Sequence, residues 1–337
     1  MYDDAIDSLT AEEAARALGV KPATLYAYVS RGLIRSERAG GRARRYHAAD
    51  IAALQRGGLP SGPVLTSAIT LIRGGRVFFR GRDAVDLART LSVREAAALI
   101  WDCDPAASFA ADNLPDPLPD GAALHDVLAG ATPLARMLAL LQLVIATEPR
   151  WSQATAEFFG YAGARLLRFL AAAAAGRAPS GRPIEAVLAE AWGLDRETRP
   201  LLRAGLILAA DNGVDAAAMA ARAAAAVGLP PWRSVAAGLA ALDCNSDVAA
   251  DARAGALVTL LPQRSPTPRS LPQAMSQLGT ALRFPPGGAA ALYAIGRAIG
   301  LIAHVAEERA AKRAFHARGA YIGLSPETGA NPQSGKG

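Results

Sequence analysis

The hydrophobic and polar positions divide the chain into a short first part and a longer second part. In residues 9–56, the apolar positions of AEEAARALGV and KPATLYAYVSRG recur three and four apart, which predicts two short helices. Thr10 and Glu13 have the spacing of a capping box at the start of the first helix. Gly19 suits the end of that helix, and Pro22 suits the first turn of the next. Two short helices joined by a glycine-containing turn predict a helix-turn-helix.

A strongly basic segment follows the second predicted helix. From Arg31 to Arg45 the chain carries six arginines against one acidic residue, Glu37, around a Gly40-Gly41 pair that suits a hairpin turn. A basic hairpin beside a recognition helix is typical of a wing that contacts DNA phosphates, and the alternative is a solvated charged loop on a helical interaction module. HAADIAAL (47–54) predicts a closing helix. The candidate DNA-binding residues are Lys21, Thr24, Tyr26, Arg35, Arg38, Arg42, Arg44 and Arg45.

The longer second part is predicted to be mainly helical. GGLPSGP introduces a linker over residues 57–66, and TSAITLIRGGRVFFRGRD then alternates around Gly74-Gly75, which predicts a β-hairpin. Most later segments, such as 133–147 and 199–212, space their apolar residues at three and four, which favours an all-α domain. The polar residues 326–337 are expected to form a disordered tail.

Composition narrows the class of protein. A chain of 337 residues, 51% of them hydrophobic, is long enough for two domains. Two cysteines exclude a disulfide framework and a four-cysteine metal site, and they suit a reducing cytoplasm. The acidic start MYDDAIDSLT does not resemble a signal peptide, and no uninterrupted apolar run of membrane-spanning length is expected. Only three of the 36 basic residues are lysine, a bias typical of genome composition, so the net charge of +6 alone is weak evidence for a nucleic-acid partner.

Two resemblances extend this interpretation. The first 56 residues resemble the DNA-binding domain of MerR-type regulators and phage excisionases. Residues 67–325 resemble citrate synthases, on the blocks SAIT (67–70), FRG (79–81), EAAALIW (95–101) and two long helical stretches before and after FPPGG. This resemblance implies an all-α body with a shortened small domain, and a fused winged helix also occurs in a bacterial branch of the family.

The resemblance also indicates where the chemistry of acetyl-CoA and oxaloacetate should lie. Asn212 stands where the family has an oxaloacetate-binding histidine, and Asp247 stands where it has the histidine that polarises the enolate. No histidine lies between residues 126 and 303, and no acidic residue lies between Asp251 and Glu307, where the catalytic aspartate is expected. Arg297 matches a carboxylate-binding arginine, and His316 replaces the arginine that reaches the partner's site. The family's catalytic residues are thus not retained, and the substrate-binding candidates are Arg297, Asn212 and His316.

These observations predict a cytoplasmic, catalytically degenerate citrate-synthase-family protein that acts as a DNA-binding regulator or regulatory subunit. Two alternatives stay open: a protein that modulates an active citrate synthase, and a working acyltransferase of the tricarboxylic acid cycle with rebuilt residues. The expected partners are double-stranded DNA and either a second copy or an intact citrate synthase paralogue, with acyl-CoA or a small carboxylate as a further possibility. No membrane, cofactor or metal is expected. For Arg297 two roles stay open, as part of an anion-binding site or as a structural arginine. His304 is expected to be structural.

Overall fold

The computed structural model describes residues 8–30, 34, 36–38, 44–55, 66–116, 121–147, 158–242, 252–261 and 265–311. The chain divides into two compact units, one comprising residues 1–66 and 316–337 and the other residues 67–315. Each unit is described by itself.

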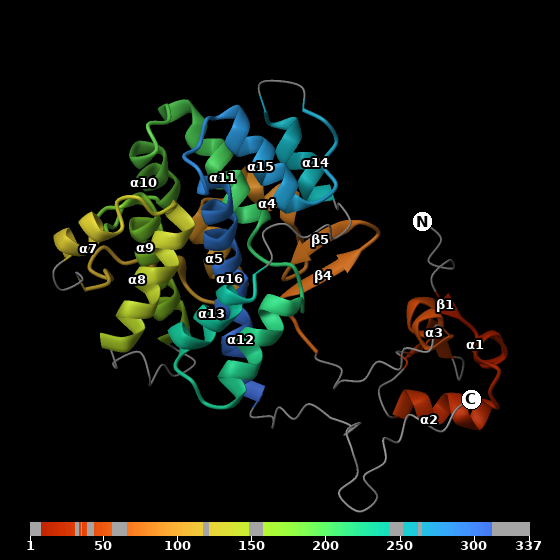
Figure 1. Cartoon of the computed structure of the whole chain (residues 1–337). Helices are drawn as coiled ribbons and strands as arrows, with labels where there is room; N and C mark the ends of the chain where they lie inside the picture. The colour runs from red at the N-terminus through yellow and green to blue at the C-terminus, as the bar shows by residue number, and fades with distance from the viewer. Residues whose placement is uncertain are drawn as a thin grey trace, which may run out of the picture. The chain divides into compact units, whose positions relative to one another are not determined.

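The N-terminal unit contains the predicted helix-turn-helix (Figure 1). The capping box of Thr10 and Glu13 is confirmed, and Gly19 ends the first helix with φ 66°. The hairpin is also confirmed, and an unpredicted short strand pairs with it, giving the sheet order β1-β3-β2. Leu25 and Tyr46 belong to a small buried core shared by the helices and the sheet. The elements are β1 (Ser8–Leu9), α1 (Ala11–Leu18), α2 (Pro22–Ser30), β2 (Ser36–Arg38), β3 (Arg44–His47) and α3 (Ala48–Gln55).

The second unit begins with the predicted hairpin. β4 (Thr70–Arg73) pairs with β5 (Arg76–Phe79), and Gly74 and Gly75 turn between them with φ of 56° and 71°. Positive φ at both central turn positions is the requirement that a Gly-Gly pair meets at low cost. A further short strand, β6 (Arg82–Asp83), extends the sheet beyond the prediction.

Helices make up most of the remaining described residues of this unit. The predicted helix over 133–147 is confirmed, whereas the one over 199–212 ends at Leu208, so the prediction was wrong for residues 209–212. The helices are α4 (Ala84–Thr90), α5 (Val93–Trp101), α6 (Pro105–Ser108), α7 (Gly121–Val127), α8 (Pro133–Thr147), α9 (Phe159–Ala175), α10 (Ile184–Ala191), η3 (Arg196–Thr198), α11 (Arg199–Leu208), α12 (Ala216–Ala226), α13 (Pro231–Ala240), α14 (Ala252–Thr259), α15 (Leu271–Ala281) and α16 (Gly288–Ala311).

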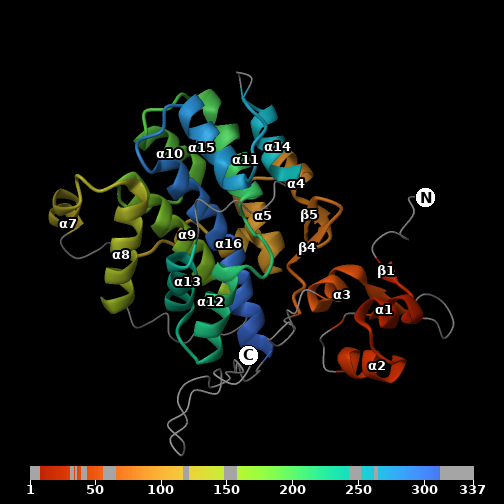
Figure 2. The ribbon, with the colours of Figure 1, turned by 45° about the vertical axis from the view of Figure 1, so that its right-hand side comes forward.

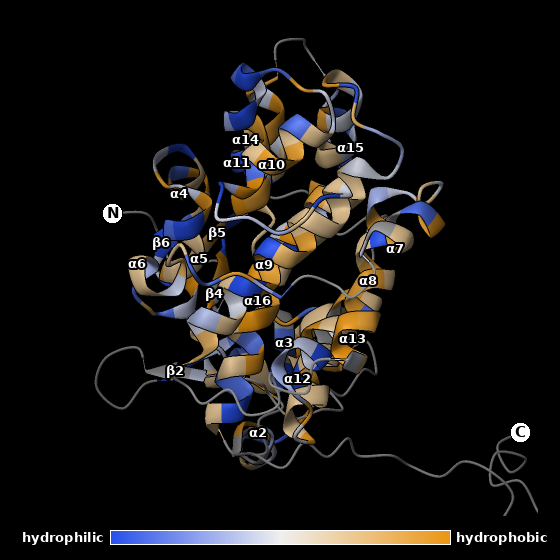
Figure 3. Cartoon of the chain, turned by 90° about the vertical axis from the view of Figure 1, so that its left-hand side faces the viewer, coloured by the Kyte–Doolittle hydropathy of each residue, from blue (hydrophilic) through white to orange (hydrophobic). Residues whose placement is uncertain are grey.

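The long helix α16 forms the centre of the second unit (Figures 1 and 2). It is long and apolar enough to cross a membrane, but 83% of its most apolar window is buried inside the fold, as expected for a core helix. Figure 3 shows that the neighbouring helices α8 and α13 also carry largely hydrophobic residues. The helices packed against α16 are α5, α8, α9, α11, α12, α13 and α15.

Candidate functional site

The segment between α11 and α12 lies directly against α16 because α16 has glycines where the two backbones meet. A Cβ atom on Gly300 would lie 2.2 Å from Asp211 Oδ1 and 2.5 Å from Ala210 O. A Cβ atom on Gly296 would lie 2.7 Å from Leu206 O. The Gly300 amide also donates a hydrogen bond to Ala210 O at 2.8 Å. These glycines hold Asp211 at the surface of the core helix.

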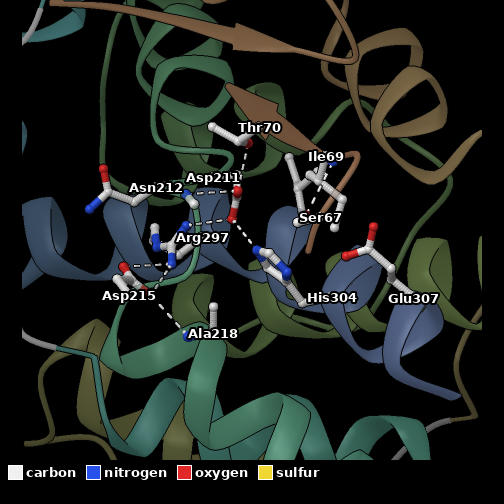
Figure 4. A network of polar contacts seen from close by, with 12 residues as sticks. Ser67, Ile69, Thr70, Asp211, Asn212, Asp215, Ala218, Arg297, His304 and Glu307 are labelled. Atoms are coloured by element: carbon white, nitrogen blue, oxygen red, sulfur yellow. Dashed lines mark hydrogen bonds and ion pairs between the residues drawn. The ribbon is translucent and has the colours of Figure 1, made fainter. Parts of the chain in front are cut away.

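Asp211 is fully buried and has four polar partners (Figure 4). Its Oδ2 accepts hydrogen bonds from Thr70 Oγ1 at 2.6 Å and from the Gly213 amide at 3.0 Å. Its Oδ1 lies 3.0 Å from Arg297 Nη1 and 3.2 Å from His304 Nε2. Burial raises the pKa of Asp211, but His304, Arg297 and the Thr70 hydroxyl outweigh burial, so the net pKa lies well below its usual range. Asp211 therefore carries a negative charge inside the core.

The Arg297 guanidinium is held between two carboxylates. Its Nη2 donates to both oxygens of Asp215, at 2.9 and 2.8 Å, and its Nη1 donates to Asp211. The Arg297 side chain is 1% exposed, whereas that of Asp215 is 25% exposed. Asp215 Oδ1 also accepts a hydrogen bond from the Ala218 amide and thereby caps α12. Burial lowers the pKa of Arg297, but the carboxylates of Asp211 and Asp215 raise it more, so Arg297 keeps its charge.

A second ion-paired group continues from His304 toward the end of α16. Arg222 Nε donates to His304 Nδ1 at 3.1 Å, and Arg222 Nη1 donates to Glu308 Oε2 at 2.8 Å. Arg222 Nη2 bonds to Glu307, whose other oxygen accepts from the Ala68 amide at 2.7 Å. Nδ1 of His304 thus faces Arg222, and its Nε2 faces Asp211. The network thus connects the first residues of the body to the middle of its core.

Asn212 is bound to a third buried arginine. Arg253 Nη2 donates to Asn212 Oδ1 at 2.7 Å, and Arg253 Nη1 donates to Leu208 O at 3.1 Å and to Asp211 O. Arg253 therefore satisfies carbonyl groups at and beyond the end of α11, which explains why the helix stops there. The Asn212 side-chain oxygen takes part in this structural contact.

Of the sequence-predicted substrate-binding set, the structure describes Arg297 and Asn212. Arg297 contacts Asp211 and Asp215, whereas the Asn212 side chain binds Arg253. Asp247 and His316 lie outside the described residues. Sequence reasoning missed the other members of the network, which are the buried Asp211, Arg222, Arg253 and Glu308 and the partly exposed Asp215 and Glu307. The available signal was the charged residues inside otherwise apolar helical segments, such as the single arginine in AAAMAARAAAA. Among the described residues, no group of histidine, cysteine and acidic side chains is arranged to hold a metal ion.

The helix α2 presents part of the candidate DNA interface. Tyr26 is 52% exposed, Lys21 is exposed directly before the helix, and Thr24 is half-buried in its first turn. Leu25, between Thr24 and Tyr26 in the sequence, is fully buried and anchors α2 to the core of the N-terminal unit.

The hairpin of β2 and β3 supplies positive charge. Its register places Arg38 opposite Arg44 and Glu37 opposite Arg45. Arg44 is exposed and donates to Ser36 Oγ at 3.4 Å, and Arg45 is half-buried. Two further predicted arginines, Arg35 and Arg42, lie outside the described residues.

Comparison with known proteins identifies both parts of the chain. Residues 58–277, more than half of the chain, match the family model described as "Citrate synthase, C-terminal domain". The chain belongs to the citrate synthase family. Residues 8–58 match a model described as "Helix-turn-helix domain", so this family member carries a fused helix-turn-helix domain. A search of curated proteins gave no significant match.

Solved structures agree with this family at the level of the fold. The citrate synthase of Thermotoga maritima is 18% identical, with a TM-score of 0.61, and the match covers 78% of this chain and 95% of that one. The citrate synthase of Pyrobaculum aerophilum is 17% identical, with a TM-score of 0.59 and coverage of 86% and 95%. The citrate synthase of Thermoplasma acidophilum, solved with carboxymethyl coenzyme A and oxaloacetate, is 16% identical, with a TM-score of 0.57 and coverage of 78% and 94%. At such identities the likeness shows a shared fold.

Proposed function

We propose that this protein is a DNA-binding regulator of the MerR type whose citrate-synthase-like body no longer performs the family's condensation. The body would provide a dimerisation and regulatory module in the cytoplasm, as a pair of identical chains or as a pair with an intact citrate synthase. A two-fold dimer would present two helix-turn-helix units to a palindromic DNA site.

The observation that carries the proposal is that His304 and Asp211, a histidine and a carboxylate in the core of the body, are bound by other side chains. Deprotonating an acyl-CoA requires a base and a donor that can reach the substrate. His304 is fully buried between Arg222 and Asp211, and Asp211 is fully buried among its own partners. The pKa of Asp211 is lowered, which makes it a weak base. These groups stabilise the fold and are poorly suited to proton transfer.

Family membership favours one alternative, an active acyltransferase that condenses acetyl-CoA with oxaloacetate through rebuilt residues. The two functions predict opposite results in a CoA-release assay at high enzyme concentration, with acetyl-CoA or propionyl-CoA and oxaloacetate. We expect no release. Turnover that the Asn212→Ala variant abolishes would establish the enzyme and refute the proposal.

The DNA-binding arm of the proposal is tested with the full-length protein. A binding site is first selected from random duplexes, and affinity is then measured at several salt concentrations. Arg44→Ala and Arg45→Ala should each weaken binding and reduce the salt slope by about 1, because each removes a phosphate contact. Arg89→Ala is the matched control. Arg89 is an exposed arginine of the body, and its ion pair with the exposed Asp86 is long at 3.8 Å. Equal effects from all three variants, or none from any, would contradict the assignment of the wing.

A further inference from the structure

The body contains a cavity outside the network around Asp211. It lies between the first turn of α5, the middle of α9 and the segment that leads into α10, and its volume of about 390 Å³ includes the open solvent at its mouth. Its described lining residues are separate from those that contact Asp211 and Arg297. Three of them are arginines, namely Arg94, Arg168 and Arg182. A volume in this range is typical of a cavity that holds a small molecule, so the charges on its wall determine the class of ligand.

Arg168 is a buried arginine that has no carboxylate partner among the described residues. It is 4% exposed, and its guanidinium donates three hydrogen bonds to backbone carbonyls of the segment 109–113, two of them at 2.9 and 3.0 Å. Burial and the neighbouring Arg94 lower the pKa of Arg168, and the weaker attraction of Asp112 does not offset them. A guanidinium does not lose its proton in a protein, so Arg168 brings an uncompensated positive charge to the wall of the cavity.

The other charges on the cavity leave this excess in place. Arg182 is paired with Glu190 at 2.6 Å. Arg94, in the first turn of α5, is exposed and forms no hydrogen bond or ion pair within the described part of the chain. Glu185 is the one carboxylate among the described lining residues, and burial raises its pKa, which three nearby arginines offset only in part. Arg94 and Arg168 thus share at most one negative charge, and a ligand with a single negative charge would balance the other.

Apolar side chains form most of the remaining wall. Val93, Phe109 and Ile184 line the cavity and belong to the hydrophobic core of the body. The Phe109 ring is stacked on Trp101, with the ring centroids 5.8 Å apart, so its position is fixed from behind. A ligand that uses both parts of the wall carries one anionic group on an apolar body.

We infer that this cavity is a binding site for a small monocarboxylate with an apolar body. The carboxylate pairs with Arg94 and Arg168, and the body packs against Phe109 and Ile184. The inference goes beyond the proposed regulatory function, because it gives the body a small-molecule ligand, and it depends on the cavity alone.

The test uses benzoate, which joins a carboxylate to a flat apolar ring, and the full-length protein. Binding is measured by calorimetry and by the rise in Tm relative to chloride at equal ionic strength. We expect saturable binding of benzoate. Acetate, which lacks the apolar body, and benzyl alcohol, which lacks the charge, should each bind at least about tenfold more weakly.

Three variants locate the ligand. Arg94→Gln should weaken benzoate binding about tenfold, because it removes a charge from the cavity without breaking a described hydrogen bond or ion pair of the fold. Arg233→Gln is the matched control, since Arg233 is also an exposed arginine in the first turn of a helix, α13, and it should bind benzoate as wild type does. Glu185→Gln keeps the shape of the side chain and should tighten benzoate binding, because it removes the competing carboxylate.

Two results would overturn the inference. One is the absence of saturable benzoate binding to the folded protein, and the other is equal benzoate affinity in wild type, Arg94→Gln and Arg233→Gln. Because the measurement contains neither DNA nor acyl-CoA, its failure is distinct from failure of the proposed function.

Discussion

Replacing Gly300 with alanine tests whether the close approach of α16 to the segment at residues 209–211 determines stability. The added Cβ atom would lie 2.2 Å from Asp211 Oδ1, 2.5 Å from Ala210 O and 2.7 Å from Asp211 Cβ. Ordinary van der Waals contact begins near 3.4 Å, so the segment must move outward by about 1 Å. Two of the three crowded atoms belong to a buried, charged residue, which has little freedom to move.

The magnitude follows from the contacts that this movement disturbs. Overpacking in a core costs about 1–3 kcal/mol, and loss of one partner from a buried ion pair costs about 3–5 kcal/mol. A shift of about 1 Å weakens but does not abolish the Asp211 contacts with Arg297 and Thr70, so we expect a loss of about 3 kcal/mol or more. For a body of this size that corresponds to a fall in Tm of about 6 °C or more.

The assay is urea unfolding of the full-length protein followed by circular dichroism, with Tm from calorimetry. Gly255→Ala is the matched control, because Gly255 lies inside α14 and an added Cβ would meet no atom within 4 Å. There alanine should stabilise the protein by up to about 1 kcal/mol through helix propensity. If Gly300→Ala were as stable as wild type, Asp211 would not pack against α16 as closely as the structure shows.

Two further predictions address other buried polar groups. Trp101→Phe removes the 2.9 Å hydrogen bond from Nε1 to Ile299 O and should lower the free energy of unfolding in urea by about 1–3 kcal/mol. Trp192→Phe should lower it less, because the Trp192 indole nitrogen has no hydrogen-bond partner among the described residues. The lowered pKa of Asp211 means that its contribution to stability is present above the unfolded-state value, about pH 4, and is lost as the pH falls below it. The stability of Asp211→Asn should accordingly decline less than that of wild type between about pH 5 and pH 3, and an identical decline would refute the assigned charge.

The sequence predicted the N-terminal unit well because its signals are local. A capping box, a C-terminal glycine with positive φ and a Gly-Gly turn each depend on residues within a few positions of one another, and the structure shows the first two at Thr10 and Gly19. The two-residue strands β1 and β6 were missed because each exists only through pairing with a strand elsewhere. The partner of β1 is distant in sequence, whereas β6 pairs with the adjacent β5, and neither two-residue segment is long enough to show a periodic pattern.

The candidate site shows the limit of periodicity more sharply. Residues 209–212 read as the end of a helix because alanine has the highest helix propensity. The chain leaves the helix there because Arg253, Gly300 and the partners of Asp211 bind its backbone and side chains from other elements. Arg222 likewise stands in an alanine-rich helix that gives no hint of its partners on α16. Such contacts join residues about 40 to 90 positions apart, and only the folded chain brings them together.

The buried network also changes what the presence of Arg297 means. A buried ion pair is a weak source of net stability, because desolvation offsets most of the attraction, but removal of one partner leaves an uncompensated charge and is strongly destabilising. Arg297 and Asp211, which are both fully buried, are therefore mutually required whether or not any substrate binds, and Asp215 adds a partly exposed carboxylate to the pair. An arginine at this position thus does not by itself argue for catalysis.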